Sequence, residues 1–174
     1  MLRDALMNRV SLAEELEGFL SELYRSEADF PYAKIYDSKA GIKAFVEKVI
    51  LDMREGDEIC TIENPNAGNY HRIFSKEFFY AMLDMKRRRS IATRSLVVTG
   101  SVAGIDPQKL ERQNITLREM PEEIRFKASF WIIGDMLVLF SGKYPFIVAV
   151  NHKIIAGSMK SIFDYLWRVS GDAS

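Results

Sequence analysis

Residues 127–169 hold three apolar, strand-like runs and a closing amphipathic helix: KASFWIIG at 127–134, MLVLFSG at 136–142, PFIVAV at 145–150 and SMKSIFDYLWRV at 158–169. Gly134-Asp135 and the turn from Gly142 to Pro145 separate the runs. Strands this apolar, joined by tight turns, predict a sheet that is buried on nearly both faces. Because the connections are short, we expect these strands to be antiparallel, to lie at one edge of the sheet, and to be capped by the helix.

Upstream of this stretch, strand-like segments alternate with helical ones. We expect strands at 33–37, 57–63, 90–100 and 115–121, a helix at 38–53, a second helix that starts near Asn66 or at Ser75, and a short helical or irregular connector at 106–114. Alternating strands and helices predict right-handed βαβ units and parallel strand pairs. The expected fold class is therefore α/β, with a mixed, mostly parallel sheet and helices on both faces.

Residues 2–25 predict a long N-terminal helix. At 1.5 Å per residue it would extend roughly 36 Å, which is more than one small sheet needs as cover. Its apolar residues recur every seven positions and form a short coiled-coil seam, interrupted by Arg9: Leu2, Leu6, Ala13, Leu16, Leu20 and Leu23. We therefore expect residues 1–28 to be a linker and homodimerisation helix and residues 31–174 to be the α/β domain. Leu12 and Phe19 widen the stripe enough to leave packing within the chain as the alternative.

Composition excludes several classes of protein. The chain has 174 residues, of which 48% are hydrophobic, and 24 basic residues balance 24 acidic ones. Zero net charge gives no overall field that would attract nucleic acid or an anionic membrane. The single cysteine, Cys60, lies in a strand-like segment and is expected to be an inert thiol. No apolar run approaches the roughly 18–20 residues of a membrane span, and no signal peptide is recognisable, so we expect a cytoplasmic location and no membrane partner.

This order of elements resembles the phospholipase D-like domain that forms the C-terminal, effector-binding part of TrmB-type transcriptional regulators. The matching stretches are the helix at 2–25, AKIYDSKAGIKAFVEKVI (33–50), MKRRRSIATRSLVV (85–98), LREMP (117–121), IIGDMLVLFS (132–141) and IAGSMKSIFDYLW (155–167). Together they cover essentially the whole chain. The resemblance implies a phospholipase D-like fold and a homodimeric, effector-sensing role in transcription regulation. Such regulators contact DNA through a winged helix, and the resemblance implies that this would be a part separate from residues 1–174.

Phospholipase D enzymes use a His-x-Lys pair, in which the histidine attacks phosphorus and the lysine holds the phosphate oxygens. This chain has His71 and His152, and the residues two positions further on are Ile73 and Ile154. The chain also lacks GxGxxG, Walker and GxSxG patterns, and one cysteine with two distant histidines cannot form a structural zinc site. We therefore expect no enzyme activity, no metal and no cofactor. The alternatives are a degenerate phosphodiesterase or nucleic-acid-processing enzyme with an unrecognised nucleophile, and a dimeric scaffold without ligand.

A ligand site is expected at the carboxyl ends of the parallel strands, where open α/β sheets bind small molecules. The candidate residues are Glu63, Asn64, Asn66, Arg94, Lys127, Ser129 and Ser141. Their donors and acceptors suit a sugar-like or phosphorylated effector, because such groups match vicinal hydroxyls or phosphate oxygens. Other interpretations stay open: Arg94 can pair with Glu63 or with a helix carboxylate, and Asn64-Pro65-Asn66 is typical of a tight turn.

The basic run Lys86–Arg89 ends the second predicted helix. Four cations at a helix C-terminus complement the helix dipole. We expect a solvated helix end here, rather than a contact with DNA phosphates.

Overall fold

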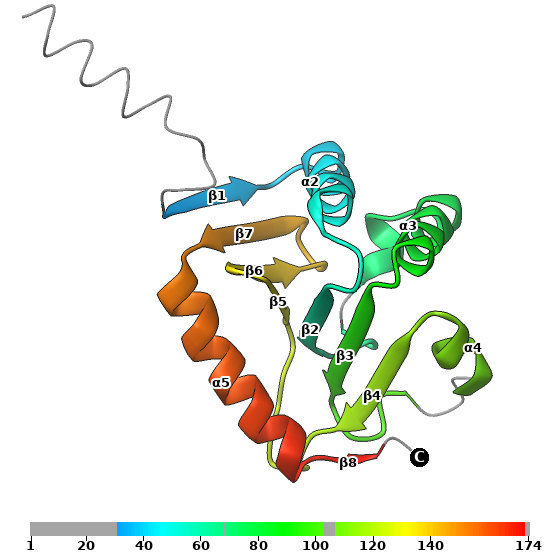
Figure 1. The fold of residues 1–174 in the computed structure, drawn as a ribbon, viewed down its shortest axis with the longest axis vertical. Helices are drawn as coiled ribbons and strands as arrows, with labels where there is room; N and C mark the ends of the chain where they lie inside the picture. The colour runs from blue at the N-terminus through cyan, green and yellow to red at the C-terminus, as the bar shows by residue number, and fades with distance from the viewer. Residues whose placement is uncertain (1–30, 68, 103–106, 173–174) are drawn as a thin grey trace, which may run out of the picture. The chain divides into compact units, whose positions relative to one another are not determined.

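The computed structural model describes residues 31–67, 69–102 and 107–172. The chain divides into two units, residues 1–32 and 33–174, and the second contains nearly all of the described residues. The predicted linker helix at 1–28, with Leu2, Leu6, Ala13, Leu16, Leu20 and Leu23, lies outside the described residues. The elements of Figure 1 are β1 (Tyr32–Tyr36), α2 (Lys39–Asp52), β2 (Glu58–Glu63), the 3-10 helix η1 (Tyr70–Arg72), α3 (Lys76–Arg88), β3 (Ala92–Val97), α4 (Pro107–Arg112), β4 (Ile115–Glu119), β5 (Ser129–Ile133), β6 (Met136–Ser141), β7 (Phe146–Asn151), α5 (Lys153–Val169) and β8 (Gly171–Asp172).

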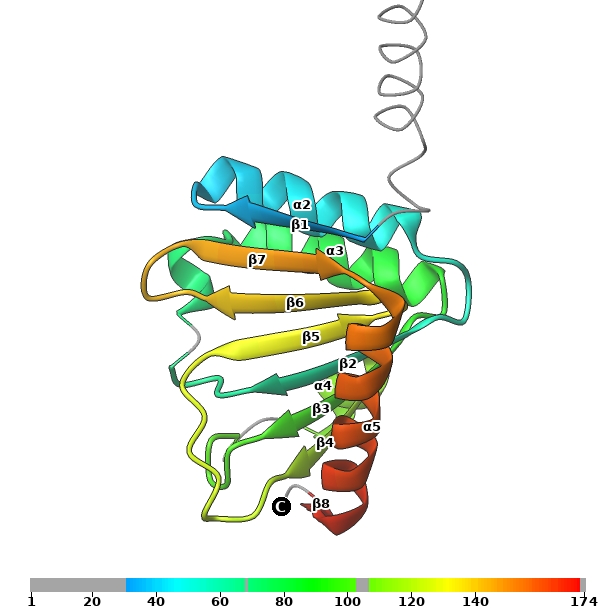
Figure 2. The same cartoon turned by 90° about the vertical axis from the view of Figure 1, so that its left-hand side faces the viewer.

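Eight strands form one mixed sheet in the order β1-β7-β6-β5-β2-β3-β4-β8, which can be followed in Figure 2. Strands β2, β3 and β4 are parallel to one another. The pairs β2-β5, β5-β6, β6-β7 and β4-β8 are antiparallel. The prediction of a mostly parallel sheet was therefore wrong: the sheet is mixed, but most of its described pairings are antiparallel.

The error has a topological cause. The alternation of strand and helix at the start of the chain suggests that β1 and β2 are neighbours, but β7, β6 and β5 lie between them. Helix α2 instead carries the chain from the edge of the sheet to its middle. The closing strands then fill the interval between β1 and β2, and their short connections require antiparallel pairing.

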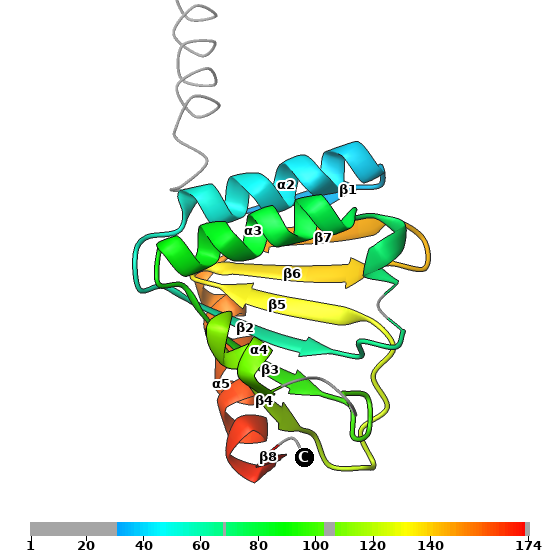
Figure 3. The same cartoon turned by 90° about the vertical axis from the view of Figure 1, so that its right-hand side faces the viewer.

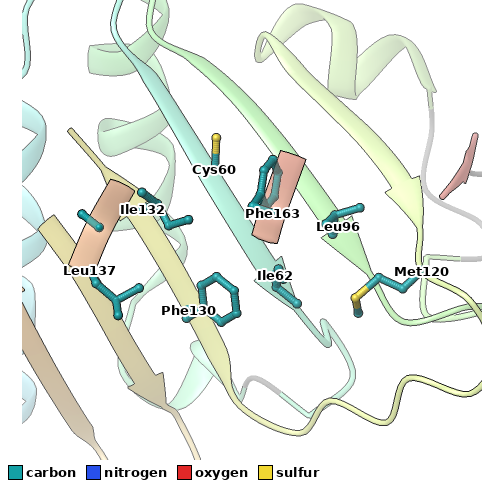
Figure 4. Close-up of a cluster of buried hydrophobic side chains, with 9 residues drawn as sticks. Cys60, Ile62, Leu96, Met120, Phe130, Ile132, Leu137 and Phe163 are labelled. Carbon is teal, nitrogen blue, oxygen red and sulfur yellow. The ribbon is translucent and has the colours of Figure 1, made fainter. Parts of the chain in front are cut away.

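Helices cover both faces of the sheet, as predicted. Helix α5 crosses one face (Figure 2), and α2, α3 and α4 lie on the other (Figure 3). Under α5, Phe163 is completely buried in a cluster with residues of β2, β3, β5 and β6. In Figure 4 its ring lies among side chains that include Cys60, Ile62 and Leu96. Two further buried clusters lie on the opposite face; one contains Ile42 and Phe45 of α2, and the other contains Met82 of α3.

Local signals set the boundaries of these elements. The Ser38 hydroxyl accepts a hydrogen bond from the amide of Gly41 at 3.1 Å and caps α2, and Ser75 caps α3 through the amide of Phe78 at 3.2 Å. Of the two predicted starts of α3, near Asn66 or at Ser75, the second is therefore correct. Gly134 has φ +55° in the β5-β6 turn, a conformation that favours glycine.

The basic run at the end of α3 is only partly solvated. Arg87 and Arg88 are exposed and pair with Asp84 of the same helix. Arg89 turns toward α2, where its Nη1 lies 3.0, 2.5 and 2.8 Å from the carbonyl oxygens of Ile50, Leu51 and Met53. It thereby satisfies carbonyl groups that the end of a helix leaves without partners.

Candidate functional site

A cavity of about 640 Å³ lies between the sheet and the helices α2, α3 and α4. We call it the α3 cavity. Its lining is mostly aliphatic and aromatic, and includes Val49, Phe74, Phe78, Met82, Trp131 and Ile133. A smaller set of polar residues also lines it: Thr61, Glu63, Tyr70, Lys86, Thr93 and Gln113. A volume in the range of ~300–1,000 Å³ with a few converging polar groups is typical of small-molecule sites.

Glu63 is the centre of a hydroxyl network at the carboxyl end of β2. Its Oε1 accepts hydrogen bonds from Ser95 at 2.7 Å and from Thr61 at 3.1 Å, and the Thr61 hydroxyl also lies 2.7 Å from that of Ser95. Its Oε2 accepts from the Tyr70 hydroxyl at 2.9 Å, which lies 2.6 Å from the Ser129 hydroxyl. Burial and the nearby charge of Glu63 raise the pKa of Tyr70 well above its ordinary value. Tyr70 is therefore a neutral donor that holds the carboxylate in place.

Lys86 lies in the last turn of α3, and its side chain points inward instead of into solvent. The residue is only 7% exposed, so the expectation of a solvated lysine at this helix end was wrong. Its ammonium group donates a short hydrogen bond to the Thr93 hydroxyl on β3. Burial lowers the pKa of Lys86 to about 8, although the charge of Glu63 acts in the opposite direction. The cavity thus contains an amine that gains and loses its proton close to neutral pH.

Two of the seven predicted ligand residues, Glu63 and Ser129, belong to this network, and Glu63 lines the α3 cavity. Asn64 and Asn66 follow β2 in a turn. The Asn64 side chain accepts from the amides of Asn66 and Ala67 and donates to the carbonyl oxygen of Phe126, while Asn66 is exposed. The tight-turn interpretation therefore describes the contacts of this segment.

Arg94 lies on the opposite face of the sheet from the cavity. Its guanidinium binds both carboxylate oxygens of Glu58 at 2.7 Å and lies 3.2 Å from Asp164 of α5. It also stacks on the rings of Phe163 and Trp167, with its central carbon 5.2 and 5.3 Å from the ring centroids. Arg94 therefore pairs with a helix carboxylate, as one of the two expected pairings stated, and not with Glu63.

Lys127 and Ser141 lie apart from the cavity lining. Lys127 is exposed in the segment before β5, and Ser141 is half-buried at the end of β6 opposite Phe146. The structure therefore does not bring the seven predicted residues together in one site.

Sequence reasoning missed Tyr70, Lys86 and Thr93. Lys86 was grouped with its neighbours in the basic run at the helix end, which was expected to be solvated. The sequence did carry a signal for the face: Thr61 and Glu63 alternate on β2, and Thr93 and Ser95 alternate on β3. In the structure Thr61 pairs with Ser95. Alternation places these polar residues on one face and Cys60 and Arg94 on the other.

Within the described ranges, no group of three histidine, cysteine or acidic residues is arranged to hold a metal ion. In that same part of the chain, no helix combines the length and apolar character of a membrane span. His71, at η1, is exposed, and His152 precedes α5 without a side-chain capping bond.

Comparison of the fold with solved structures finds several proteins of similar architecture. TrmBL2, an archaeal chromatin protein with a novel mode of DNA binding, superposes with a TM-score of 0.58 at 12% identity, over 99% of this chain and 66% of TrmBL2. The phospholipase D family member Nuc from Salmonella typhimurium gives 0.54 at 14% identity, over 83% of this chain and 100% of Nuc. NucT from Helicobacter pylori gives 0.56 at 9% identity, over 82% and 99% of the two chains.

Neither a family model nor a curated protein matches the sequence. The chain spans about two thirds of the length of TrmBL2. At these identities the similarity concerns the fold alone, and on that basis the chain has a phospholipase D-like fold.

Proposed function

We propose that this domain binds a small-molecule effector without chemically changing it, and that it serves as the sensing and dimerisation domain of a cytoplasmic transcriptional regulator. The α3 cavity carries this proposal. It combines a ligand-sized volume of about 640 Å³ with a few inward-facing polar groups. The fold that the chain shares with TrmBL2, an archaeal chromatin protein, supports a role near DNA.

The contacts around Glu63 favour binding over catalysis. Its oxygens accept from Tyr70, Ser95 and Thr61, so the carboxylate is occupied by hydroxyl donors instead of being poised beside a nucleophile. Of the described residues that line the cavity, none is a histidine. The His-x-Lys pair on which the phospholipase D reaction depends is missing from the sequence.

A thermal-shift screen tests the sensing role. A ligand that binds only the folded state raises the melting temperature by mass action. Sugars, sugar phosphates, nucleotides and medium-chain carboxylates should include at least one compound that raises it for the wild type. Leu83→Trp, which adds volume to the cavity lining from α3, should abolish the shift, whereas Tyr80→Trp, at a position that is 55% exposed, should preserve it. If no compound shifts the melting temperature, the sensing role is wrong and a ligand-free scaffold remains.

The dimerisation role rests on the seven-residue apolar repeat at 2–23. Light scattering of the whole chain and of a version that starts at Phe30 tests it. The whole chain should be a dimer, and the shortened chain should have a lower mass or dissociate at a higher concentration. Equal masses at equal concentrations would remove the N-terminal segment from the interface.

A second candidate function is hydrolysis of phosphodiesters. The fold shared with Nuc, a phospholipase D family member, and the amine of Lys86 in the cavity favour it. Turnover of bis(4-nitrophenyl) phosphate that disappears in Lys86→Met but persists in Lys76→Met would support this alternative over the sensing role. We expect no turnover above that of the buffer.

A further inference from the structure

We propose that the α3 cavity takes an apolar molecule with a single anionic headgroup, most simply a medium-chain carboxylate, and that Lys86 pairs with that headgroup. The inference deepens the proposed function, because it assigns a chemical class to the effector of the same cavity. It also departs from the sugar-like or phosphorylated ligand that the sequence alone suggested.

The first step of the argument is the incomplete pairing of Lys86. The residue is 7% exposed, and its ammonium group donates to the neutral hydroxyl of Thr93. Within the described residues, no carboxylate lies within ion-pair distance of its Nζ. An ammonium group has three donors, and a buried cation is stable only when it is paired or deprotonated. Lys86 therefore faces the cavity with donors that an anionic ligand can satisfy.

The second step concerns Glu63, the carboxylate that lines the same cavity. It acts on Lys86 electrostatically, but its two oxygens already accept hydrogen bonds from Ser95, Thr61 and Tyr70. It is therefore held at the carboxyl end of β2 by β2, β3 and η1. A negatively charged headgroup should sit beside Lys86 and away from Glu63, which orients the ligand along the cavity.

The third step concerns the remainder of the lining. Phe78 and Met82 of α3, Val49 of α2 and Trp131 of β5 present apolar surface to the cavity. A sugar would place hydroxyl groups against these side chains without partners, and each unpaired group would weaken binding. An alkyl or aryl body instead gains from the removal of apolar surface from water. One cation in a largely apolar cavity thus selects for an amphiphilic anion.

The test compares decanoate with decanol, below the concentrations at which either aggregates, because the two differ mainly in the charged headgroup. Titration calorimetry on the full chain should give tighter binding of decanoate than of decanol at pH 7. Lys86→Met should reduce that preference by about tenfold or more, since one partner of a buried charge pair is removed. Lys76→Met is the matched control, because Lys76 is an exposed lysine on the same helix and is not part of the cavity lining. This variant should keep the wild-type preference.

The outcomes separate this inference from the proposed function. Equal affinity for decanoate and decanol, or an unchanged preference in Lys86→Met, would overturn the role of Lys86 while leaving an effector cavity. Binding of glucose 6-phosphate but not decanoate would overturn the ligand class alone. If decanoate, decanol, sugars and sugar phosphates all fail to bind, both proposals are wrong. Circular dichroism of Lys86→Met, compared with the wild type, shows that a lost preference is not a lost fold.

Discussion

The charged side chains on the two faces of the sheet have opposite environments. On the α5 face, Arg94 is surrounded by Glu58, Asp164 and two aromatic rings, and its carboxylate partners remain partly exposed to water. On the α3 face, Lys86 is buried beside a cavity and bonded to a neutral hydroxyl. Arg94 is a paired charge at the edge of the core, and its contact with Asp164 holds α5 against the sheet. An incompletely matched charge inside a cavity reduces stability, and in our proposal Lys86 is the charge that pairs with the ligand.

The pKa shifts follow the same division. Burial raises the pKa of Glu58, but the hydrogen bonds from Arg94 and Cys60 and the charges of Arg94 and Lys160 outweigh it and hold the value below its ordinary range. The hydrogen bonds that Arg94 donates to Glu58 likewise raise the pKa of Arg94. Burial lowers the pKa of Lys86 instead. The charged forms of Glu58 and Arg94 are therefore favoured on the α5 face, and that of Lys86 is disfavoured on the α3 face.

The largest loss of stability should come from a substitution on the α5 face of the sheet. Phe163→Ala removes a ring that is 0% exposed under α5, and should reduce the free energy of unfolding by about 3–5 kcal/mol. Phe78→Ala is the matched change on the cavity face. Because Phe78 is half-buried and already borders empty space, it should cost only about 1–2 kcal/mol. Urea denaturation measures both, and equal losses would contradict the contrast between the two faces.

Lys86→Met should stabilise the protein at pH 7. Burial lowers the pKa of Lys86 to about 8 from an ordinary value of 10.5, so the folded state disfavours the proton that the unfolded chain retains. The penalty is fully present below pH 8, shrinks as the pH rises from 8 to 10.5, and amounts to at most about 3 kcal/mol. The wild type should thus gain stability over this range relative to the variant.

Denaturation curves at pH 7, 9 and 10.5 test this linkage, with Lys76→Met as the control. Glu63 and Tyr70 also border the cavity and are present in all of these proteins. The difference between the wild type and Lys86→Met therefore reports the titration of Lys86 together with its electrostatic coupling to Glu63. A wild type and a Lys86→Met variant with parallel pH dependence would show that the lysine is not desolvated in solution.

Arg94→Met should cost about 1–2 kcal/mol, because it breaks charge-assisted hydrogen bonds that are only partly shielded from water. The Arg94 side chain is 23% exposed, and those of Glu58 and Asp164 are 37% and 45% exposed. Arg88→Met removes an arginine that is 76% exposed and pairs with Asp84 on α3, and should cost about 0.5 kcal/mol or less. Added salt should reduce the difference in the free energy of unfolding between the wild type and Arg94→Met only slightly.

Among the substitutions of buried or half-buried residues, Tyr70→Phe should cost the least. It removes the hydroxyl that donates to Glu63 but keeps the ring stacked on Phe140, with centroids 5.1 Å apart. The loss should be about 1 kcal/mol. Tyr144→Phe, at a position that is 71% exposed, should change the free energy of unfolding by less than about 0.5 kcal/mol. No difference between the two variants would show that the hydroxyl network contributes nothing to stability.

Local patterns predicted the elements well and their arrangement less well. The apolar runs, caps and turns located the strands β1 to β7 and the helices α2, α3 and α5 close to where the structure has them, and the connector at 106–114 contains α4. The two-residue strand β8 carries no pattern and was missed. The position of β1 beside β7 depends on contacts between opposite ends of the described chain, which no local periodicity encodes.

The candidate site was recovered only in part for a related reason. Glu63 was found because it lies at the carboxyl end of a strand, and Ser129 because it was grouped with the polar residues expected near that end. Arg94 was assigned to the same site because only its residue type was considered. Side chains alternate between the two faces along a strand, and this alternation puts Arg94 on the other face. Lys86 was overlooked because a lysine in a basic run at a helix end is usually exposed, and only the tertiary packing of α3 on the sheet turns this one inward.

Arg89 ties the end of α3 to the end of α2 through the carbonyl groups of Ile50, Leu51 and Met53. Since residues of both helices form the wall of the cavity opposite the sheet, widening it at this corner would break several hydrogen bonds at once. The two helices are thus linked at their C-terminal ends. Near the other ends of the two helices lies a weaker link, the Lys43 ammonium of α2 at 5.9 Å from the centroid of the Phe78 ring of α3, so we expect a bulky ligand to separate α2 and α3 there first.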